Sequence, residues 1–186
     1  MELSFANLWQ MLRLSVLDPG RAAEVVLSLP IRGGLRFAAV IVSAALSAIA
    51  LWATYAAFPM TLPDGSVMEP IGPLSWAVMV GAGVFLLSGL IFVVGKLAGG
   101  KAEFTSLVLL LAWFQFVQLA MYIVQIVLLV LLPPLGVMAT LASLGLTVWV
   151  LGHFTRVAHG FRSVAGPILG LVGGAVLLFL LLLSGA

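Results

Sequence analysis

Long uncharged, apolar stretches alternate along the chain with short segments that carry its charges, prolines and glycines. A stretch of about 20 apolar residues forms a helix that crosses a hydrocarbon layer of about 30 Å. The stretch at 104–152 is too long for one such helix, so Pro133, Pro134 and Gly136 are interpreted as the turn of a helical hairpin. The pattern predicts an all-α integral membrane protein with five transmembrane helices, at about 36–58, 74–96, 104–132, 135–154 and 164–184.

Two short amphipathic helices are predicted in residues 1–34, ahead of the transmembrane domain at 35–186. The first has an apolar stripe of Phe5, Leu8, Trp9, Leu12 and Val16. This stripe is typical of an interfacial helix on a membrane surface. Packing on the protein's own spans fits equally well, because Met11 and Leu14 interrupt the polar side. In the second helix Asp18 is the expected cap, and Pro30 the expected stop.

Composition excludes a soluble domain. Hydrophobic residues make up 63% of the chain and charged residues 8%, against about 25% charged residues in soluble domains. The chain has no cysteine, which excludes disulfides and thiolate metal sites. All eight Lys and Arg fall in segments on one side of the predicted spans, which places the amino terminus in the cytoplasm. Nucleic acid is not an expected partner, since so few charges form no basic patch.

The basic residues at the span ends are predicted to contact lipid headgroups, so membrane lipids are expected partners. They are Arg32, Arg36, Lys96, Lys101, Arg156 and Arg162. His153 and His159 are expected beside them among the headgroups. These histidines are six residues apart, on different helical faces, whereas two ligands on one helix need a spacing of three or four. No metal site is therefore expected.

A polar face interrupts the third span. Gln115, Gln118, Tyr122 and Gln125 lie at offsets of 3, 7 and 10, which places them on one side of a helix. Lipid cannot satisfy a side-chain amide, so this face should turn toward other helices, a cavity, a ligand or a partner protein. Hydrogen bonding between helices is the favoured interpretation, and a ligand or partner site is the alternative.

A second candidate surface is the glycine face of the fifth span, formed by Gly166, Gly170 and Gly174. Glycines four residues apart let another helix approach closely, so this is a predicted helix-packing face. Packing within the chain is favoured over packing against another subunit, and a homo-oligomer stays possible. The partial matches to phosphate-binding, dinucleotide-binding and serine-nucleophile motifs each lack a required residue. We therefore expect no catalytic residue, no cofactor and no enzyme.

Three stretches carry a family resemblance. Asp18-Pro19 precedes a short helix and Pro30, a turn at 99–101 enters the third span, and a run at 149–160 leads into the fifth. In order and spacing the chain resembles the Yip1 family of five-span membrane proteins, in its compact bacterial form. The resemblance implies the bacterial cytoplasmic (inner) membrane. Five spans and the one-sided charges then place the carboxyl terminus in the periplasm. Eukaryotic members are associated with vesicle trafficking, with small GTPases and with the organisation of curved membranes, and the resemblance implies these associations in outline.

Two departures limit what the resemblance implies. Only about 34 residues precede the first span, where those relatives have a longer region for partner binding, and the expected proline within 112–119 is missing. We therefore expect the architecture to transfer, and GTPase binding not to. The favoured function is a non-enzymatic organising or accessory subunit that binds other membrane proteins. The alternative is a small transporter or channel with a pathway along the glutamine face of the third span.

Overall fold

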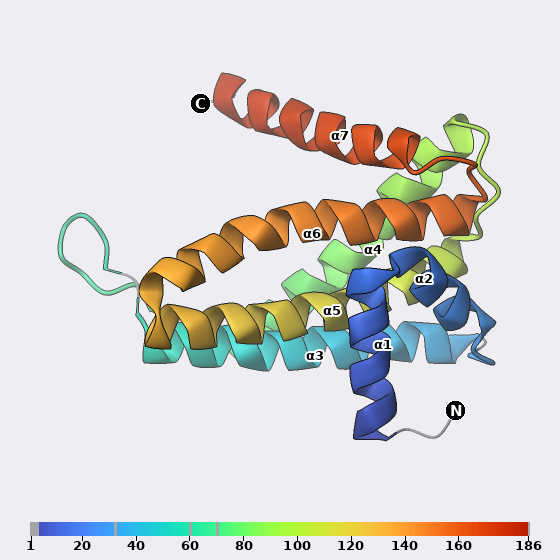
Figure 1. Cartoon of the computed structure of the whole chain (residues 1–186). Helices are drawn as coiled ribbons and strands as arrows, with labels where there is room; N and C mark the ends of the chain where they lie inside the picture. The colour runs from blue at the N-terminus through green and yellow to red at the C-terminus, as the bar shows by residue number, and fades with distance from the viewer. Residues whose placement is uncertain (1–3, 32, 60, 70, 186) are drawn as a thin grey trace.

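A computed structural model describes residues 4–31, 33–59, 61–69 and 71–185, and these residues form seven helices (Figure 1). They are α1 (Phe5–Leu17), α2 (Pro19–Ser28), α3 (Gly34–Ala57), α4 (Pro73–Leu97), α5 (Phe104–Leu131), α6 (Pro133–His159) and α7 (Ala165–Ser184). The last five are long and apolar enough to cross a membrane. The predicted all-α fold with five membrane spans is confirmed.

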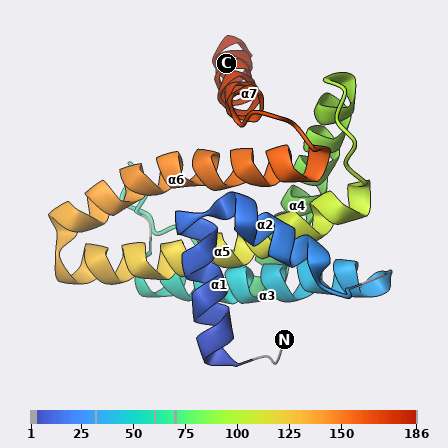
Figure 2. The same cartoon turned by 45° about the vertical axis from the view of Figure 1, so that its right-hand side comes forward.

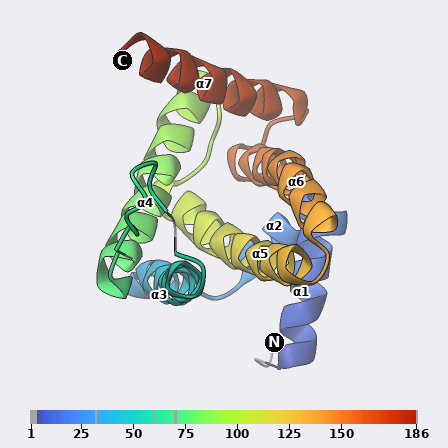
Figure 3. The same ribbon diagram turned by 90° about the vertical axis from the view of Figure 1, so that its left-hand side faces the viewer.

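Helix α5 is the centre of the bundle. It contacts α3, α4 and α6, and its amino-terminal half also meets α1 and α2. Figure 3 shows α5 between α3 and α6, with α7 on the far side of α6. The core is concentrated in this half of α5, where residues 107–112 pack with Ala22, Val26, Val150 and Phe154. Each of these side chains is apolar, so their burial at one end of the bundle fixes α2 and α6 against α5.

The connection between α5 and α6 is shorter than predicted. Only Leu132 separates the two helices, and both prolines belong to the first turn of α6. A proline is tolerated there because the first backbone N–H groups of a helix have no intrahelical acceptor. Gly136 lies inside the helix, where an added Cβ would lie 2.7 Å from the Leu129 backbone nitrogen. The glycine therefore permits close approach of the two helices and is not part of a turn.

Helix α6 also ends later than predicted, at His159 and not near residue 154. His153, Arg156 and His159 are helical, and the end comes at Gly160, whose φ of +71° is left-handed, before Arg162. Glycine adopts this conformation without the steric cost that a Cβ adds, and it commonly terminates helices. The basic residues at 153–159 therefore do not end the helix, whereas the glycine does.

Helix α1 runs across the direction of α3 and α5 (Figures 1 and 2). It is fixed by Met11 and Ser15, which are buried, and by the indole N–H of Trp113, which donates to the Ser15 hydroxyl at 2.9 Å. The predicted stripe turns away from this contact: Phe5 is 84% exposed, Leu8 and Trp9 are exposed, and Leu12 and Val16 are half-buried. One face of α1 therefore packs on the protein's own helices, while the apolar stripe faces outward.

Helix α2 follows the predicted pattern. The Asp18 carboxylate accepts a hydrogen bond from the Arg21 backbone N–H at 3.1 Å and so caps the helix. Ala22, Ala23 and Val26 are buried against α5 and α6, whereas Arg21 and Glu24 are exposed.

Candidate functional site

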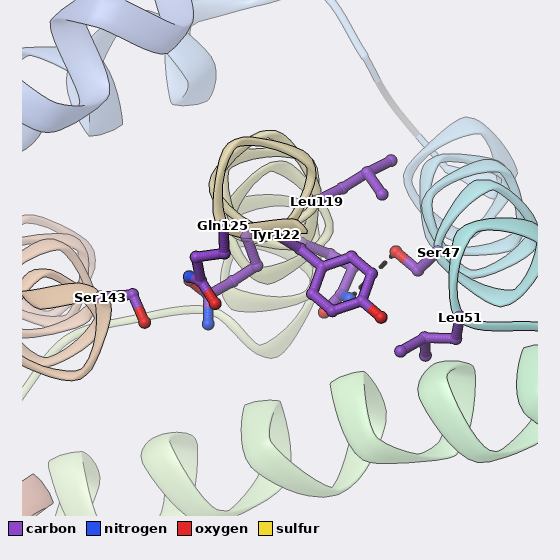
Figure 4. Close-up of a pocket in the computed structure, with 8 residues that line it drawn as sticks. Ser47, Leu51, Leu119, Tyr122, Gln125 and Ser143 are labelled. Carbon is purple, nitrogen blue, oxygen red and sulfur yellow. Dashed lines mark hydrogen bonds between the residues drawn. The ribbon is translucent and has the colours of Figure 1, made fainter. Parts of the chain in front are cut away.

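The four residues of the predicted polar face line one recess, between α3, α5 and α6 (Figure 4). Its volume is about 230 Å³. Residues from all three helices line this polar recess: Gln115, Gln118, Leu119, Tyr122 and Gln125 from α5, Ser47 and Leu51 from α3, and Ser143 from α6. The helical spacing thus predicted that four of these α5 residues share one side of the helix, and the structure adds Leu119 to them.

Two glutamines join helices at the recess. The Gln115 amide Nε2 donates to the Ser47 hydroxyl at 3.1 Å, and the Thr147 hydroxyl donates to Gln118 Oε1 at 3.2 Å. These bonds connect α5 to α3 on one side and to α6 on the other. For these two residues, the favoured interpretation of hydrogen bonding between helices agrees with the structure.

Tyr122 and Gln125 behave differently. In the part of the chain that the structure describes, neither side chain has a hydrogen-bond partner. Both are half-buried, and Figure 4 shows them extending from α5 on the side that lies between α6 and α3. A phenol and an amide within a membrane-spanning segment gain from a hydrogen-bonding partner that hydrocarbon cannot supply. These two residues are therefore the part of the recess that is open to an occupant.

The recess contains no ionisable carboxylate, Lys, Arg or His among its lining residues. An ion would therefore be desolvated there without a counter-charge. Among the described residues, no group of three His, Asp or Glu side chains is placed to hold a metal ion. The chemistry available is hydrogen bonding to an uncharged group.

An apolar layer lies along α5 on the amino-terminal side of the recess. Phe114 and Phe154 pack edge to face with ring centroids 6.5 Å apart, and Leu110, Leu111 and Val150 are fully buried around them. None of these residues lines the recess. The polar face therefore occupies only part of the span and ends at tightly packed side chains.

Ser47 and Ser143 line the recess but were not among the predicted site residues. The Ser143 hydroxyl donates to the Thr140 carbonyl within its own helix at 2.7 Å. Serines in apolar helices commonly satisfy their hydroxyl donor with a carbonyl of the preceding turn in this way. A lone serine therefore gives little signal. In α3, Ser43 and Ser47 lie four residues apart in an apolar span, and that spacing was the available indication.

His159 was expected among lipid headgroups, and that expectation was wrong. It is 1% exposed, its ring Nε2 lies 3.2 Å from the Ile91 carbonyl oxygen, and its own carbonyl accepts from the Lys101 N–H at 3.0 Å. The ring fits between Gly95 and Gly100, where an added Cβ on either residue would overlap it. His159 thereby joins α6 to α4 and to the α4–α5 turn, so the turn at 99–101 and the run at 149–160 meet in space.

These are two of the three stretches on which the family resemblance was based. The sequence matches the Yip1 domain over residues 14–185, from within α1 to the end of α7. The chain belongs to the Yip1 family. A comparison with curated proteins found no match, and neither did a comparison with solved structures. The Yip1 match spans all five candidate membrane helices, so sequence and fold agree on a multi-pass membrane protein.

One of the predicted headgroup contacts of this Yip1 protein has partners inside the fold. The Arg36 guanidinium donates through Nε to the Ile31 carbonyl at 2.9 Å, and through Nη1 to the hydroxyls of Thr105 at 2.9 Å and Ser106 at 3.2 Å. It therefore joins the start of α3 to the start of α5, in addition to any lipid contact.

The other predicted headgroup residues differ in exposure. Lys96, Lys101 and Arg162 are exposed at the ends of α4 and α6 or in the adjoining links. Arg156 is half-buried: a Cβ on Gly20 would lie 2.9 Å from its Nη2, and its Nε is buried with no hydrogen-bond partner among the described residues. Arg32 lies outside the described residues. Lipid contact stays a prediction for all of them.

The glycine face of α7 is not packed within the described part of this Yip1 chain. An added Cβ on Gly166, Gly170 or Gly174 would meet no atom within 4 Å. Helix α7 instead turns Ile168 toward α6, where it lies against Gly152. Internal packing of the glycine face, which the sequence analysis favoured, is therefore wrong. Packing against another subunit stays a prediction.

Proposed function

We propose that this Yip1 protein is a non-enzymatic organising or accessory subunit that binds other membrane proteins through the polar recess. The observation that carries the proposal is the pair Tyr122 and Gln125, which offer hydrogen-bonding groups with no partner among the described residues. In hydrocarbon, the side chain of a neighbouring helix satisfies such groups, whereas lipid tails do not. A membrane protein beside the recess therefore gains contacts that are not available from the bilayer.

Two further surfaces support partner binding. The uncovered glycine face of α7 lets a second helix approach closely. The outward stripe of α1, with Phe5, Leu8 and Trp9 exposed, suits insertion into the membrane surface on the side of the amino terminus. From the one-sided distribution of Lys and Arg, we place that surface in the cytoplasm. The resemblance to compact bacterial Yip1 proteins makes a bacterial inner membrane the proposed location.

The alternative is a small transporter or channel with a pathway along the glutamine face. Such a pathway would have to cross the apolar layer around Phe114 and Phe154, which is closed in this conformation. The alternative predicts a flux in reconstituted vesicles that disappears when Gln115, Gln118 and Gln125 are replaced by Leu. Partner binding predicts no such flux.

The experiment is extraction from the native membrane in mild detergent, followed by native gels and mass spectrometry of the particle. The wild-type chain should carry a stoichiometric membrane-protein partner. The double variant Tyr122→Phe/Gln125→Leu should lose it and still fold, because neither residue makes a hydrogen bond within the described fold. The matched control is Ile123→Leu/Val124→Leu, at exposed apolar positions on the same turn of α5, and it should keep the partner. A wild-type chain that is always recovered alone would overturn the proposal.

A further inference from the structure

We propose that the recess receives an uncharged amide or hydroxyl side chain, Asn, Gln, Ser or Thr, carried near the midpoint of a partner's transmembrane helix. The inference rests on the proposed function, because it specifies what the partner must present. It depends on the depth of the recess, on the hydrogen-bonding groups left open in it and on its lack of charge.

The recess lies at the middle of the membrane-spanning segments. Ala57 ends α3 ten residues beyond Ser47, Leu131 ends α5 nine residues beyond Tyr122, and Pro133 begins α6 ten residues before Ser143. At about 1.5 Å per residue, the recess is about 15 Å from this end of the bundle. That is about half of a hydrocarbon layer of about 30 Å. The recess therefore lies close to the bilayer midplane.

Depth distinguishes a helix from a lipid headgroup as the occupant. Headgroups lie at the borders of the hydrocarbon layer, about 15 Å from its midplane. Tyr122 lies nine residues and Gln125 six residues inside the end of α5 at Leu131, about 14 Å and about 9 Å from that border. The central residue of a transmembrane helix lies at the same depth as the recess without any distortion of the bilayer. Ser47 is buried and the other seven lining residues are half-buried, so the recess is partly open to an approaching side chain.

The groups left open in the recess select the chemistry of the occupant. Gln115 uses Nε2 for Ser47 and keeps its carbonyl oxygen as an acceptor, while Gln118 accepts from Thr147 and keeps its Nε2 as a donor. Tyr122 and Gln125 each add a donor and an acceptor. An amide or a hydroxyl matches this mixture because it donates and accepts at once. A carboxylate or an ammonium would be desolvated without a counter-charge.

A second copy of this chain does not supply such a group from α7. That helix is the least covered of the five spans, and it carries no hydrogen-bonding side chain between residues 165 and 183. The polar residues of the recess itself are set back between three helices. Because the least covered span of a second copy cannot supply the group, we take a helix of a different protein as the occupant.

The test uses the full chain in lipid vesicles with synthetic transmembrane peptides as probes. Each peptide is a Leu-Ala helix that has Lys anchors and a single variable residue: Asn at the centre, Leu at the centre, or Asn one turn from the end. Association is measured by energy transfer between a labelled peptide and the labelled protein. Central Asn should bind about 3- to 10-fold more tightly than central Leu, since a polar contact between membrane helices contributes roughly that much. Asn near the end should bind like Leu.

The preference should disappear in Tyr122→Phe/Gln125→Leu and persist in Ile123→Leu/Val124→Leu. Equal binding of the central Asn and Leu peptides would overturn the inference, as would equal binding of the two Asn peptides. Energy transfer between two labelled copies of the chain that falls in the double variant would also overturn it, because the occupant would then be a second copy. A native partner that co-purifies while the peptides show no preference would leave the proposed function standing and remove this inference alone.

Discussion

The imidazole of His159 occupies the space beside Gly95, at a distance that leaves no room for a Cβ on residue 95. The same ring approaches Gly100, whose N–H donates to the Gly95 carbonyl at 2.8 Å. Close contacts of the ring with Gly95 and Gly100, together with the Ile91 carbonyl at its Nε2, therefore hold the carboxyl-terminal end of α6 against α4.

Gly95→Ala should destabilise the protein by about 1–3 kcal/mol, because overpacking forces a buried ring or a helix to move. Thermal unfolding in detergent measures this. Gly89→Ala, on the same helix with open space at its Cβ position, is the control and should not lower the midpoint. In a His159→Ala background the cost of Gly95→Ala should shrink. An equal cost in both backgrounds would show that the ring is not the obstacle.

Trp113→Phe should loosen α1. The substitution removes the indole N–H that donates to Ser15, and one such bond contributes about 1 kcal/mol. Hydrogen exchange of residues 5–17, followed by mass spectrometry, should become faster. Trp9→Phe is the matched control, since Trp9 is exposed on the outward stripe and should leave exchange unchanged. Unchanged exchange in Trp113→Phe would mean that the buried face around Met11 holds α1 without this bond.

Gly152→Val should move α7 away from α6, because an added Cβ at Gly152 would lie 2.6 Å from Ile168 Cγ1. The chain has no cysteine, so spin labels can be attached to cysteines introduced at Leu144 and Leu178, both of which are exposed. The distance distribution between the labels should lengthen or broaden. Gly170→Val should leave it unchanged in the isolated protein, because its Cβ would face open space. A shift in the Gly170 variant would indicate that a second copy packs there.

Ser66→Ala should raise the pKa of Asp64. The Asp64 carboxylate accepts hydrogen bonds from the Ser66 hydroxyl at 2.6 Å and from its backbone N–H at 2.9 Å, and these bonds hold its pKa below the ordinary value. Because the ionised form is favoured in the fold, the loop is stabilised above the ordinary pKa, and this stabilisation is lost as the pH falls through the lowered pKa. Carbon-13 NMR titration of Asp64 measures the shift. Ser66→Thr keeps the hydroxyl and should keep the low pKa.

The sequence was sufficient to predict five long apolar helices and to place four polar residues of the recess on one side of α5. Each span is a charge-free run long enough to cross the hydrocarbon layer. The thickness of that layer sets the required length, whatever the rest of the fold is. The spacing of Gln115, Gln118, Tyr122 and Gln125 follows from helix geometry alone. Both predictions depend on local rules, which explains why they agree with the structure.

The interior position of His159 could not be derived in the same way. Its neighbours in sequence include Arg156 and Arg162, which suggest a surface, whereas the residues that enclose it lie on α4 and the following turn. The contact depends on how α4 and α6 cross. Without that geometry, the sequence around His159 favours a position at the protein surface. The glycine face of α7 could not be assigned for a similar reason. The spacing of its glycines permits close packing of another helix but does not indicate which helix packs there.

The single-residue link at Leu132 also bears on how the protein enters its membrane. No charged side chain occurs between Glu103 and His153, so α5 and α6 can insert together without carrying a charge through hydrocarbon. Helix α3 is synthesised before them and supplies Ser47. The three walls of the recess are therefore all available once α6 has been made, before translation reaches the end of α7.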